Sequence, residues 1–516
     1  MSGVLDNMVD KVELSPGSVS VLEGTMSSVV LSIDVGTSGV RAALFDERGN
    51  EVPGAQVRSH RSAAVLDFAE LDPDQLVDEV VNTIDQLLTH HVSPGTQIEL
   101  IAISAFWHSL LGVDSAGRPT TPLLTWADTR AAQFANDMRS YFDESEIHVR
   151  TGCRFHPSYW PAKLSWLKHE LTGGLFPITH HWLGFAEYLC LRLFAESSMS
   201  VSMASATGLF NQRNCDWDWD FIHDLGIDGG MLPEIKIQTS ARLTAAFASR
   251  WPTLAEARLV TIVGDGAANN IGAGCSTKSS IALMVGTSGA MRSVFAGEPP
   301  QKLSPRLWCY RANRDRVVVG GALSDGGGLV QWLTESLNLD QDRDALQMQV
   351  AKLEPDAHGL TVLPFWSGER STGWLADARG AIFGLRLQTK PVEIVRAVLE
   401  SVAYRFALIA RVLQDIAPDA TIVGSGNALR SFPAWVQILA DVLCRPMSLS
   451  GTAEASSRGA ALLALETVGK IAAIEEVQFE VQHLGVTPNM ECHDRYQLGL
   501  ARQQKLYQQL KRNRPL

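Results

Sequence analysis

The chain has 516 residues, of which 46% are hydrophobic and 19% are charged. This hydrophobic content suffices for sizeable buried cores, so the sequence excludes a wholly disordered chain and predicts two or three domains. The 44 basic and 56 acidic side chains give a net charge of −12, which argues against nucleic acid as a partner. The net charge does not exclude a small anionic ligand, because backbone amides and a metal ion can bind one.

No apolar run approaches the roughly 18 residues of a membrane span, and the acidic N-terminus lacks the pattern of a secretory signal. We therefore expect no membrane partner. The seven cysteines are far apart and include no CxxC pair, which indicates reduced thiols in a cytoplasm. Residues 1–27 have no clear strand pattern and are expected to form a loose extension. The sequence leaves the oligomeric state open, a homodimer included.

The first predicted elements form a β-hairpin. Residues 29–33 and 41–46 are apolar runs, and the glycine-containing segment 34–39 (DVGTSG) forms the turn between them. A helix is predicted over residues 72–88, from an Asp-Pro start and an apolar face at helical spacing. Residues 99–104 (ELIAIS) then return to a strand.

The hairpin pattern recurs 250 residues later. VGTSG at 35–39 reappears at 285–289, again between two apolar runs, at 280–284 and 292–295. A repeated motif in the same context indicates a duplicated half. A boundary near residue 263 would divide the ordered chain into two parts of similar length, 28–263 and 264–516.

The second half also contains long helical patterns. Apolar residues recur at helical spacing over 393–410 and 434–443, and a third helix is predicted over 456–468, with Gly469 as its C-terminal signal. Strands that alternate with helices predict an α/β fold.

The first turn has the composition of a phosphate-binding loop. Its glycines let backbone amides approach an anion, and the hydroxyls of Thr37 and Ser38 can donate to phosphate oxygens. Asp34 can hold Mg²⁺, which commonly takes one or two carboxylates when bound to a nucleotide. The second copy has Met284 at the matching place, so only the first half offers this carboxylate. An ordinary hairpin turn is the alternative interpretation.

A second aspartate, Asp265, lies between two glycines after the apolar run that ends at residue 263. A carboxylate there can accept a hydroxyl proton during phosphoryl transfer. It could equally cap the helix that follows. Further along, Gly424-Ser425-Gly426-Asn427 follows another apolar strand, where glycines would let a base or ribose approach; a structural turn is equally compatible.

These features together resemble the FGGY carbohydrate kinases, within the actin/Hsp70/sugar-kinase superfamily. The most specific stretch is 380–385 (GAIFGL), followed after seven residues by 393–400 (EIVRAVLE). The resemblance covers about residues 28–470. It implies two ribonuclease-H-like domains with a cleft between them, a sugar-binding N-terminal domain (28–263), and a C-terminal domain (264–516) that completes the nucleotide site.

The resemblance also implies roles for particular residues. Asp34 corresponds to the Mg²⁺-associated aspartate and Asp265 to the catalytic base, which also contacts the sugar. The implied ATP-binding residues are Thr37, Ser38, Gly286, Thr287, Ser288, Gly289, Gly424, Gly426 and Asn427.

The substrate side resembles that of gluconokinase-like members most. Trp107 and His108 stand where the family contacts its sugar; the histidine resembles one found in both gluconokinase-like and xylulokinase-like members, which often carry methionine in place of the tryptophan. Asp128, in a W-x-D-x-R segment, could bind sugar hydroxyls, pair with Arg130 or cap a helix.

The segment from Arg150 to Pro157 (RTGCRFHP) also resembles the gluconokinase pattern, as does 368–370 (GER). A sugar acid needs cationic or imidazole side chains for its carboxylate, and Arg154, His156 and Lys163 are the candidates. Each of them could instead be a surface charge or part of an internal pair.

The sequence thus predicts an ATP- and Mg²⁺-dependent kinase that phosphorylates a terminal hydroxyl, with D-gluconate as the expected substrate. The nearest alternative is a xylulokinase or another pentulose or polyol kinase. An actin- or Hsp70-like ATPase and a sugar-binding regulator without catalysis remain as rival interpretations. The GAIFGL stretch and the Trp107-His108 segment argue against the ATPase, and the presence of both Asp34 and Asp265 argues against the regulator.

Overall fold

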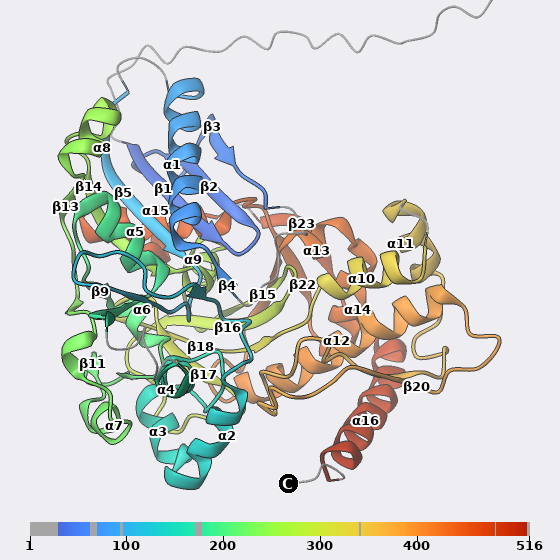
Figure 1. Ribbon diagram of the computed structural model, residues 1–516. Helices are drawn as coiled ribbons and strands as arrows, with labels where there is room; N and C mark the ends of the chain where they lie inside the picture. Colours follow the sequence, from blue (N-terminus) through green and yellow to red (C-terminus); the bar gives the residue numbers. More distant parts are fainter. Residues whose placement is uncertain are drawn as a thin grey trace, which may run out of the picture.

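The computed structural model describes residues 29–61, 70–92, 96–170, 178–339, 342–479 and 481–512. The predicted extension at 1–27 lies outside these residues. Two large β-sheets with helices packed on them form the framework (Figure 1). This is the α/β architecture that the alternation of strands and helices predicts.

In the first sheet, β1 is central: it runs antiparallel to β2 and parallel to β5, and β5 is parallel to β14. The DVGTSG turn joins β1 to β2, as predicted, and its glycines pair across the hairpin. The strands in spatial order are β13 (Ala241–Arg242), β14 (Arg258–Gly264), β5 (Ile98–Ala105), β1 (Val29–Gly36), β2 (Gly39–Phe45) and β3 (Glu51–Arg58).

The second sheet repeats this arrangement. Its strand β15 is antiparallel to β16 and parallel to β21, which is parallel to β22. The second VGTSG copy is therefore the β15–β16 hairpin turn, which confirms the predicted duplication. In spatial order the strands are β17 (Trp308–Arg311), β18 (Arg316–Leu323), β16 (Gly289–Ala296), β15 (Ser280–Val285), β21 (Thr421–Ser425), β22 (Met447–Ser450) and β23 (Val481–Val486).

Smaller strand pairs lie outside these sheets. They are β4 (Glu70–Leu71) with β7 (Leu123–Leu124), β6 (Leu111–Val113) with β8 (His181–Leu183), β9 (Met199–Ser200) with β12 (Ile235–Lys236), β10 (Phe210–Asn211) with β11 (Asp216–Trp217), and β19 (Thr361–Leu363) with β20 (Ala381–Phe383).

The helices follow from apolar periodicity and from their caps. Asp72 accepts from the amides of Asp74 and Gln75 at the start of α1, which confirms the predicted N-cap. The α-helices are α1 (Pro73–His90), α2 (Ala132–Tyr141), α3 (Glu144–Thr151), α4 (Trp160–Glu170), α5 (Phe185–Phe194), α6 (Val201–Ser205), α7 (Trp219–Asp224), α8 (Ala245–Arg250), α9 (Asp265–Gly272), α10 (Gly328–Ser336), α11 (Arg343–Ala351), α12 (Pro391–Leu413), α13 (Asn427–Ser431), α14 (Pro433–Leu443), α15 (Ala455–Thr467) and α16 (Met490–Arg512). None of them, within the described residues, is long and apolar enough to cross a membrane.

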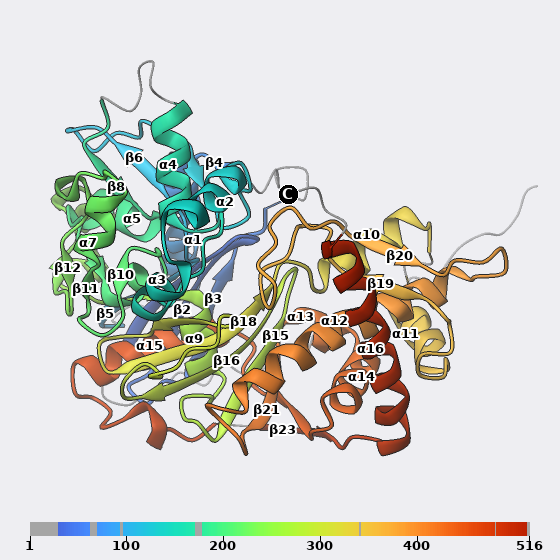
Figure 2. The same cartoon turned by 90° about the horizontal axis from the view of Figure 1, so that it is seen from below.

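Helix α15 comes late in the chain but packs on the first sheet. Its apolar residues 460–465 belong to the same buried core as β1, β5 and β14, and it crosses α9 closely (Figure 1). The helices α12, α14 and α16 lie together beside the second sheet (Figure 2). Residues of α9 also belong to the first core, so the division of the sequence near residue 263 does not coincide with the division of the cores.

Candidate active site

The carboxyl ends of three adjacent parallel strands bring the predicted catalytic residues together. In the strand register, Asp34 on β1 lies beside Ser104 on β5, and Ser104 lies beside Val263 on β14. Asp265 follows two residues after Val263, and the Trp107-His108 pair follows β5. Ligands of α/β folds commonly bind at this edge of a sheet.

Asp34 is almost fully buried and is held by two donors. The hydroxyl of Ser104 donates to one carboxylate oxygen at 2.8 Å, and Arg41 Nη1 donates to the other at 3.0 Å. Arg41 also pairs with Glu454, 3.0 Å away, in the segment before α15. The carboxylate of Asp34 is thus fixed in position by residues from both halves of the chain.

Asp265 is the first residue of α9, and its side chain does not cap the helix. Gly264 occupies the N-cap position, and one Asp265 carboxylate oxygen accepts from the next amide, Gly266, at 2.7 Å. Burial raises the pKa of Asp265 to about 6, although Arg292 opposes this rise; Asp34 raises the pKa further. A carboxyl group with this pKa is close to the range in which a general base works at neutral pH.

The rise that Asp34 causes in the pKa of Asp265 is relevant to the predicted Mg²⁺ site. Asp34 is buried and Asp265 is half-buried; a divalent cation would offset the repulsion between the two carboxylates, and carboxylate oxygens are the ligands that Mg²⁺ prefers. The residues present therefore fit a metal ion associated with Asp34.

In both predicted phosphate loops, the backbone carbonyls accept hydrogen bonds from other parts of the protein. Arg61 donates to the carbonyls of Gly36 and Thr37, at 3.0 and 2.8 Å, and Ser38 is exposed at the tip. In the second loop, Thr287 is exposed and a run of three glycines, 326–328, donates its amides to the carbonyls of Gly286 and Thr287.

This glycine run follows Asp325, a buried residue that the sequence analysis did not single out. Asp325 accepts from the amide and the hydroxyl of Ser367, both at 2.9 Å, and burial raises its pKa to about 6. An apolar strand followed closely by Asp-Gly-Gly-Gly is the signal that could have identified this support.

The predicted nucleoside segment lies beside the second phosphate loop. Gly424 and Ser425 end β21, next to β15, and Ser425 also hydrogen-bonds Asn269 of α9. Gly426 has φ +97°, and a Cβ there would lie 2.3 Å from the carbonyl oxygen of Val285. The close approach of the two segments therefore requires glycine at 426, and Asn427 begins α13 directly after it.

On the predicted sugar side, Trp107 and His108 are buried and bonded within the protein. The Trp107 indole donates to the Ser202 carbonyl at 3.1 Å and lies against Gly264 and Gly266, on either side of Asp265. His108 has one ring nitrogen 2.6 Å from the Ala206 carbonyl and the other 3.3 Å from Arg370. The Trp107 ring thus packs against the backbone on both sides of Asp265, and His108 hydrogen-bonds Arg370.

Of the three alternatives for Asp128, the structure shows the pair with Arg130. Arg130 donates to both Asp128 oxygens, at 2.7 to 3.1 Å, and stacks over Trp166. Arg130 also forms an ion pair with Glu70, at 2.9 Å. The carboxylate of Asp128 is therefore already occupied by a guanidinium.

The three candidate partners for a substrate carboxylate differ in their surroundings. Arg154 pairs with Glu144 at 2.6 Å and with the Pro305 carbonyl at 2.8 Å. Lys163 is fully buried and donates to the carbonyls of His108 and Thr125, while burial lowers its pKa to about 7. Both side chains are engaged in internal contacts, which leaves His156.

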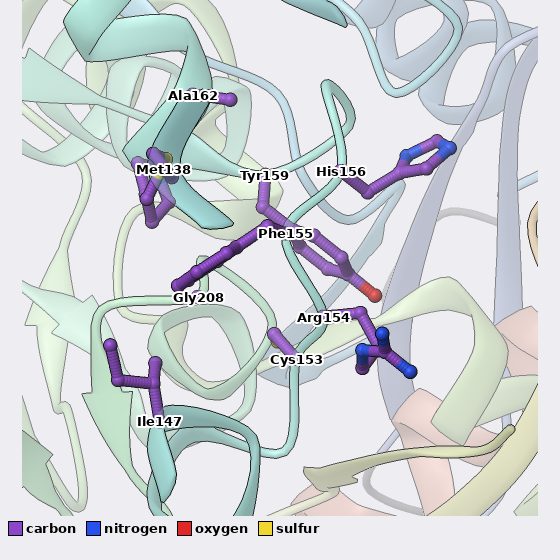
Figure 3. Close-up of a pocket in the computed structure, with 10 residues that line it drawn as sticks. Met138, Ile147, Cys153, Arg154, Phe155, His156, Tyr159, Ala162 and Gly208 are labelled. Atoms are coloured by element: carbon purple, nitrogen blue, oxygen red, sulfur yellow. The ribbon is translucent and has the colours of Figure 1, made fainter. Parts of the chain in front are cut away.

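His156 is buried against Trp374, with ring centroids 5.7 Å apart, and its Nδ1 accepts from the Ser158 amide. Figure 3 shows His156 and Arg154 pointing away from a small pocket on the other side of their segment, into which Phe155 points. That pocket is mostly apolar and contains none of the predicted phosphate-binding residues.

Two arginines at this site had no role assigned from the sequence, although Arg370 lies in the GER segment that resembles gluconokinase-like members. Arg292, on β16, and Arg370 both act on the pKa of Asp265. Arg292 is three residues beyond the second phosphate loop, on a strand of the same hairpin. This position was the sequence signal that could have indicated its place near the site. Both arginines come from the second half, and Arg370 also contacts His108 in the first.

Comparison with known proteins agrees with this geometry. The FGGY family of carbohydrate kinases matches over residues 29–272 with its N-terminal domain and over 282–467 with its C-terminal domain. A gluconokinase of Bacillus subtilis is 28% identical over 466 residues, covering 88% of this chain and 90% of that protein. A xylulose kinase of Staphylococcus xylosus is 24% identical, covering 84% and 90%.

The solved structures give the same result. A gluconate kinase and a ligand-bound xylulose kinase, both from Lactobacillus acidophilus, each superpose with a TM-score of 0.83 at 26% identity. They cover 94% of this chain and 98% and 99% of their own. The fold is therefore that of actin-like sugar kinases, and the chain belongs to the FGGY family of carbohydrate kinases as an ATP-dependent sugar kinase.

Proposed function

We propose that the protein transfers the γ-phosphate of ATP to a terminal hydroxyl of a sugar acid, D-gluconate above all. The observation that carries the phosphoryl-transfer chemistry is the half-buried Asp265, close to Asp34, at the carboxyl ends of three adjacent strands. The similarity to gluconokinases supports the choice of sugar. The free state of the seven cysteines accords with a cytoplasmic enzyme.

In the proposed reaction, Asp265 accepts the proton of the substrate hydroxyl while the hydroxyl oxygen attacks the γ-phosphorus of ATP and ADP leaves. The amides and hydroxyls of the loops at 36–39 and 286–289 would hold the phosphate chain, and the segment 424–427 would lie along the nucleoside. Mg²⁺, held near Asp34, would supply charge neutralisation on the phosphates.

The pH dependence of turnover tests the assignment of Asp265. Because only the deprotonated carboxylate accepts a proton, kcat/KM for the sugar should fall about tenfold per pH unit below about pH 6. Initial rates from pH 4.5 to 8.5 measure this. Circular dichroism at each pH is the control that the fold persists, and a flat profile down to pH 4.5 would contradict the assignment.

Substitution of Asp34 tests the metal role. Asp34→Asn keeps the contact with the Ser104 hydroxyl but removes the negative charge, so we expect the Mg²⁺ concentration for half-maximal rate to rise about tenfold or more. Asp46→Asn, in the turn directly after β2, is the matched control. An unchanged Mg²⁺ requirement in Asp34→Asn would refute a metal role for Asp34.

The substrate is tested by ADP release from MgATP with a panel of sugars, D-gluconate and D-xylulose side by side. Dominant turnover of gluconate is the expected result. Xylulose phosphorylation is the second candidate, because the xylulose kinase structure superposes as well as the gluconate kinase structure does. Turnover of xylulose without gluconate would replace the first proposal by the second.

A further inference from the structure

Among the described residues, no carboxylate contacts the buried positive charge of Arg370 directly, although Asp265 interacts with it at longer range. Arg370 is 9% exposed, and its Nε has no hydrogen-bond partner among the described residues. Nor does it form an ion pair within that part of the chain. Other buried arginines differ: Arg396 pairs with Glu400, Arg405 with Glu369, and Arg316 with two glutamates.

The side chains that hydrogen-bond Arg370 are uncharged: they are the imidazole of His108 and the hydroxyl of Tyr159. The Nδ1 of His108 donates to the Ala206 carbonyl, so its Nε2 is free to accept from Arg370 at 3.3 Å. Burial, followed by the nearby Arg370, holds the pKa of His108 well below its usual range. His108 therefore orients the guanidinium without neutralising it.

Apart from Asp265, which interacts with Arg370 only at longer range, the groups described next around Arg370 add no negative charge. The guanidinium lies over the Trp126 ring at 5.8 Å, and burial together with Arg370 keeps the pKa of His156 low. Arg292, whose Nε and Nη1 also lack partners among the described residues, is a second buried cation close by. Asp265 is the carboxylate that acts on Arg292, and burial raises its pKa to about 6.

An isolated buried charge is strongly unfavourable unless a partner compensates it, so this arrangement suits a ligand that brings its own negative charge. ATP is expected at the two loops, whereas Arg370 lies on the side of His108, Trp126 and His156, where the sugar is expected. We propose that Arg370 binds the carboxylate of a sugar acid, with His156 beside it, and thereby selects sugar acids over neutral sugars. This assignment rests on the proposed function, and it replaces Arg154 and Lys163, which have internal partners.

Arg292 is expected to act differently. It lies against Gly266, where an added Cβ would be 3.1 Å from its guanidinium, and so it is next to Asp265 and the transferred phosphoryl group. Its loss should lower turnover of every substrate to a similar extent. Comparing the substitution of Arg292 with that of Arg370 therefore separates a general loss of turnover from a loss specific to sugar acids.

The test compares D-gluconate with D-glucitol, which has a neutral CH₂OH in place of the carboxylate. Binding of each to wild-type protein and to Arg370→Gln is measured by isothermal titration calorimetry, and kcat/KM for gluconate is measured in parallel. We expect Arg370→Gln to weaken the binding of gluconate roughly 10- to 150-fold and to change the affinity for glucitol less than about threefold. The KM for ATP should not change.

Three further variants sharpen the result. Arg370→Lys keeps the charge and should recover part of the gluconate affinity. Arg154→Gln should leave gluconate binding unchanged. Arg292→Gln should lower kcat equally with gluconate and with any neutral sugar that the wild type accepts. Thermal midpoints check each fold, and Arg370→Lys carries the comparison if Arg370→Gln does not fold.

Equal losses for gluconate and glucitol in Arg370→Gln would overturn the assignment, as would unchanged gluconate binding. Both results leave the proposed function standing if wild-type protein phosphorylates gluconate. Wild-type turnover of neutral sugars alone would instead overturn the proposed substrate, and the carboxylate assignment with it.

Discussion

Asp265→Asn is expected to lower kcat by about 10²- to 10⁴-fold while MgATP binding persists, because the variant keeps the shape of the side chain but cannot accept a proton. Turnover with gluconate and MgATP binding by calorimetry measure the two effects. Asp441→Asn, a buried aspartate on α14 whose pKa is also raised by burial, is the matched control and should retain turnover. Comparable turnover of Asp265→Asn and wild type would refute the role of base.

The same substitution should stabilise the fold at neutral pH. The pKa of Asp265 is raised from about 3.8 to about 6, so the stability that its neutral form contributes is present below pH 4 and is lost as pH rises through 6. Asparagine stays neutral, and the free energy of unfolding should be greater by up to about 3 kcal/mol at pH 8. Thermal midpoints at pH 4 and pH 8 measure this, and no gain at pH 8 would contradict it.

Gly459→Ala is expected to cause the largest loss of stability. Gly459 on α15 and Gly272 on α9 lie at the crossing of these helices, where an added Cβ would be 1.9 Å from the Ala268 carbonyl oxygen and 1.8 Å from that of Ala455, respectively. Backbone atoms cannot yield as a side chain can, so the helices must separate. The cost should be about 3 kcal/mol or more, and the thermal midpoint should fall by roughly 6–12 °C.

Gly485→Ala is the matched control, since a Cβ there meets nothing within 4 Å. Because α9 begins at Asp265, a shift of this crossing should also reduce turnover by the Gly459→Ala protein that remains folded. A thermal midpoint equal to that of the control would show that the helices can separate without cost.

Several sequence predictions depended on local signals and were confirmed. Apolar runs around the two VGTSG copies specified two hairpins, since strand and turn preferences act over a few residues. The start of α1 at Asp72 and Pro73, and the helices at 391–413, 433–443 and 455–467, likewise follow from caps and helical periodicity. The family resemblance, carried by contiguous motifs, was confirmed over both halves. The roles of the individual site residues stay predictions.

What the sequence could not determine concerns partners far apart in the chain. Nothing near Arg154 or Lys163 distinguishes an internal contact from a ligand contact, because their partners Glu144, Thr125 and the Pro305 carbonyl are brought in by packing.

By itself, then, the sequence determined the α/β class, the duplicated hairpins and the positions of Asp34 and Asp265, all of which arise from short-range patterns. Only the tertiary structure decided that α15 covers the first sheet and that Arg292 and Arg370 lie near Asp265 without forming an ion pair among the described residues. The physical reason is that burial and charge compensation depend on which distant segments pack together, and a buried arginine has the same sequence appearance whether or not it is paired.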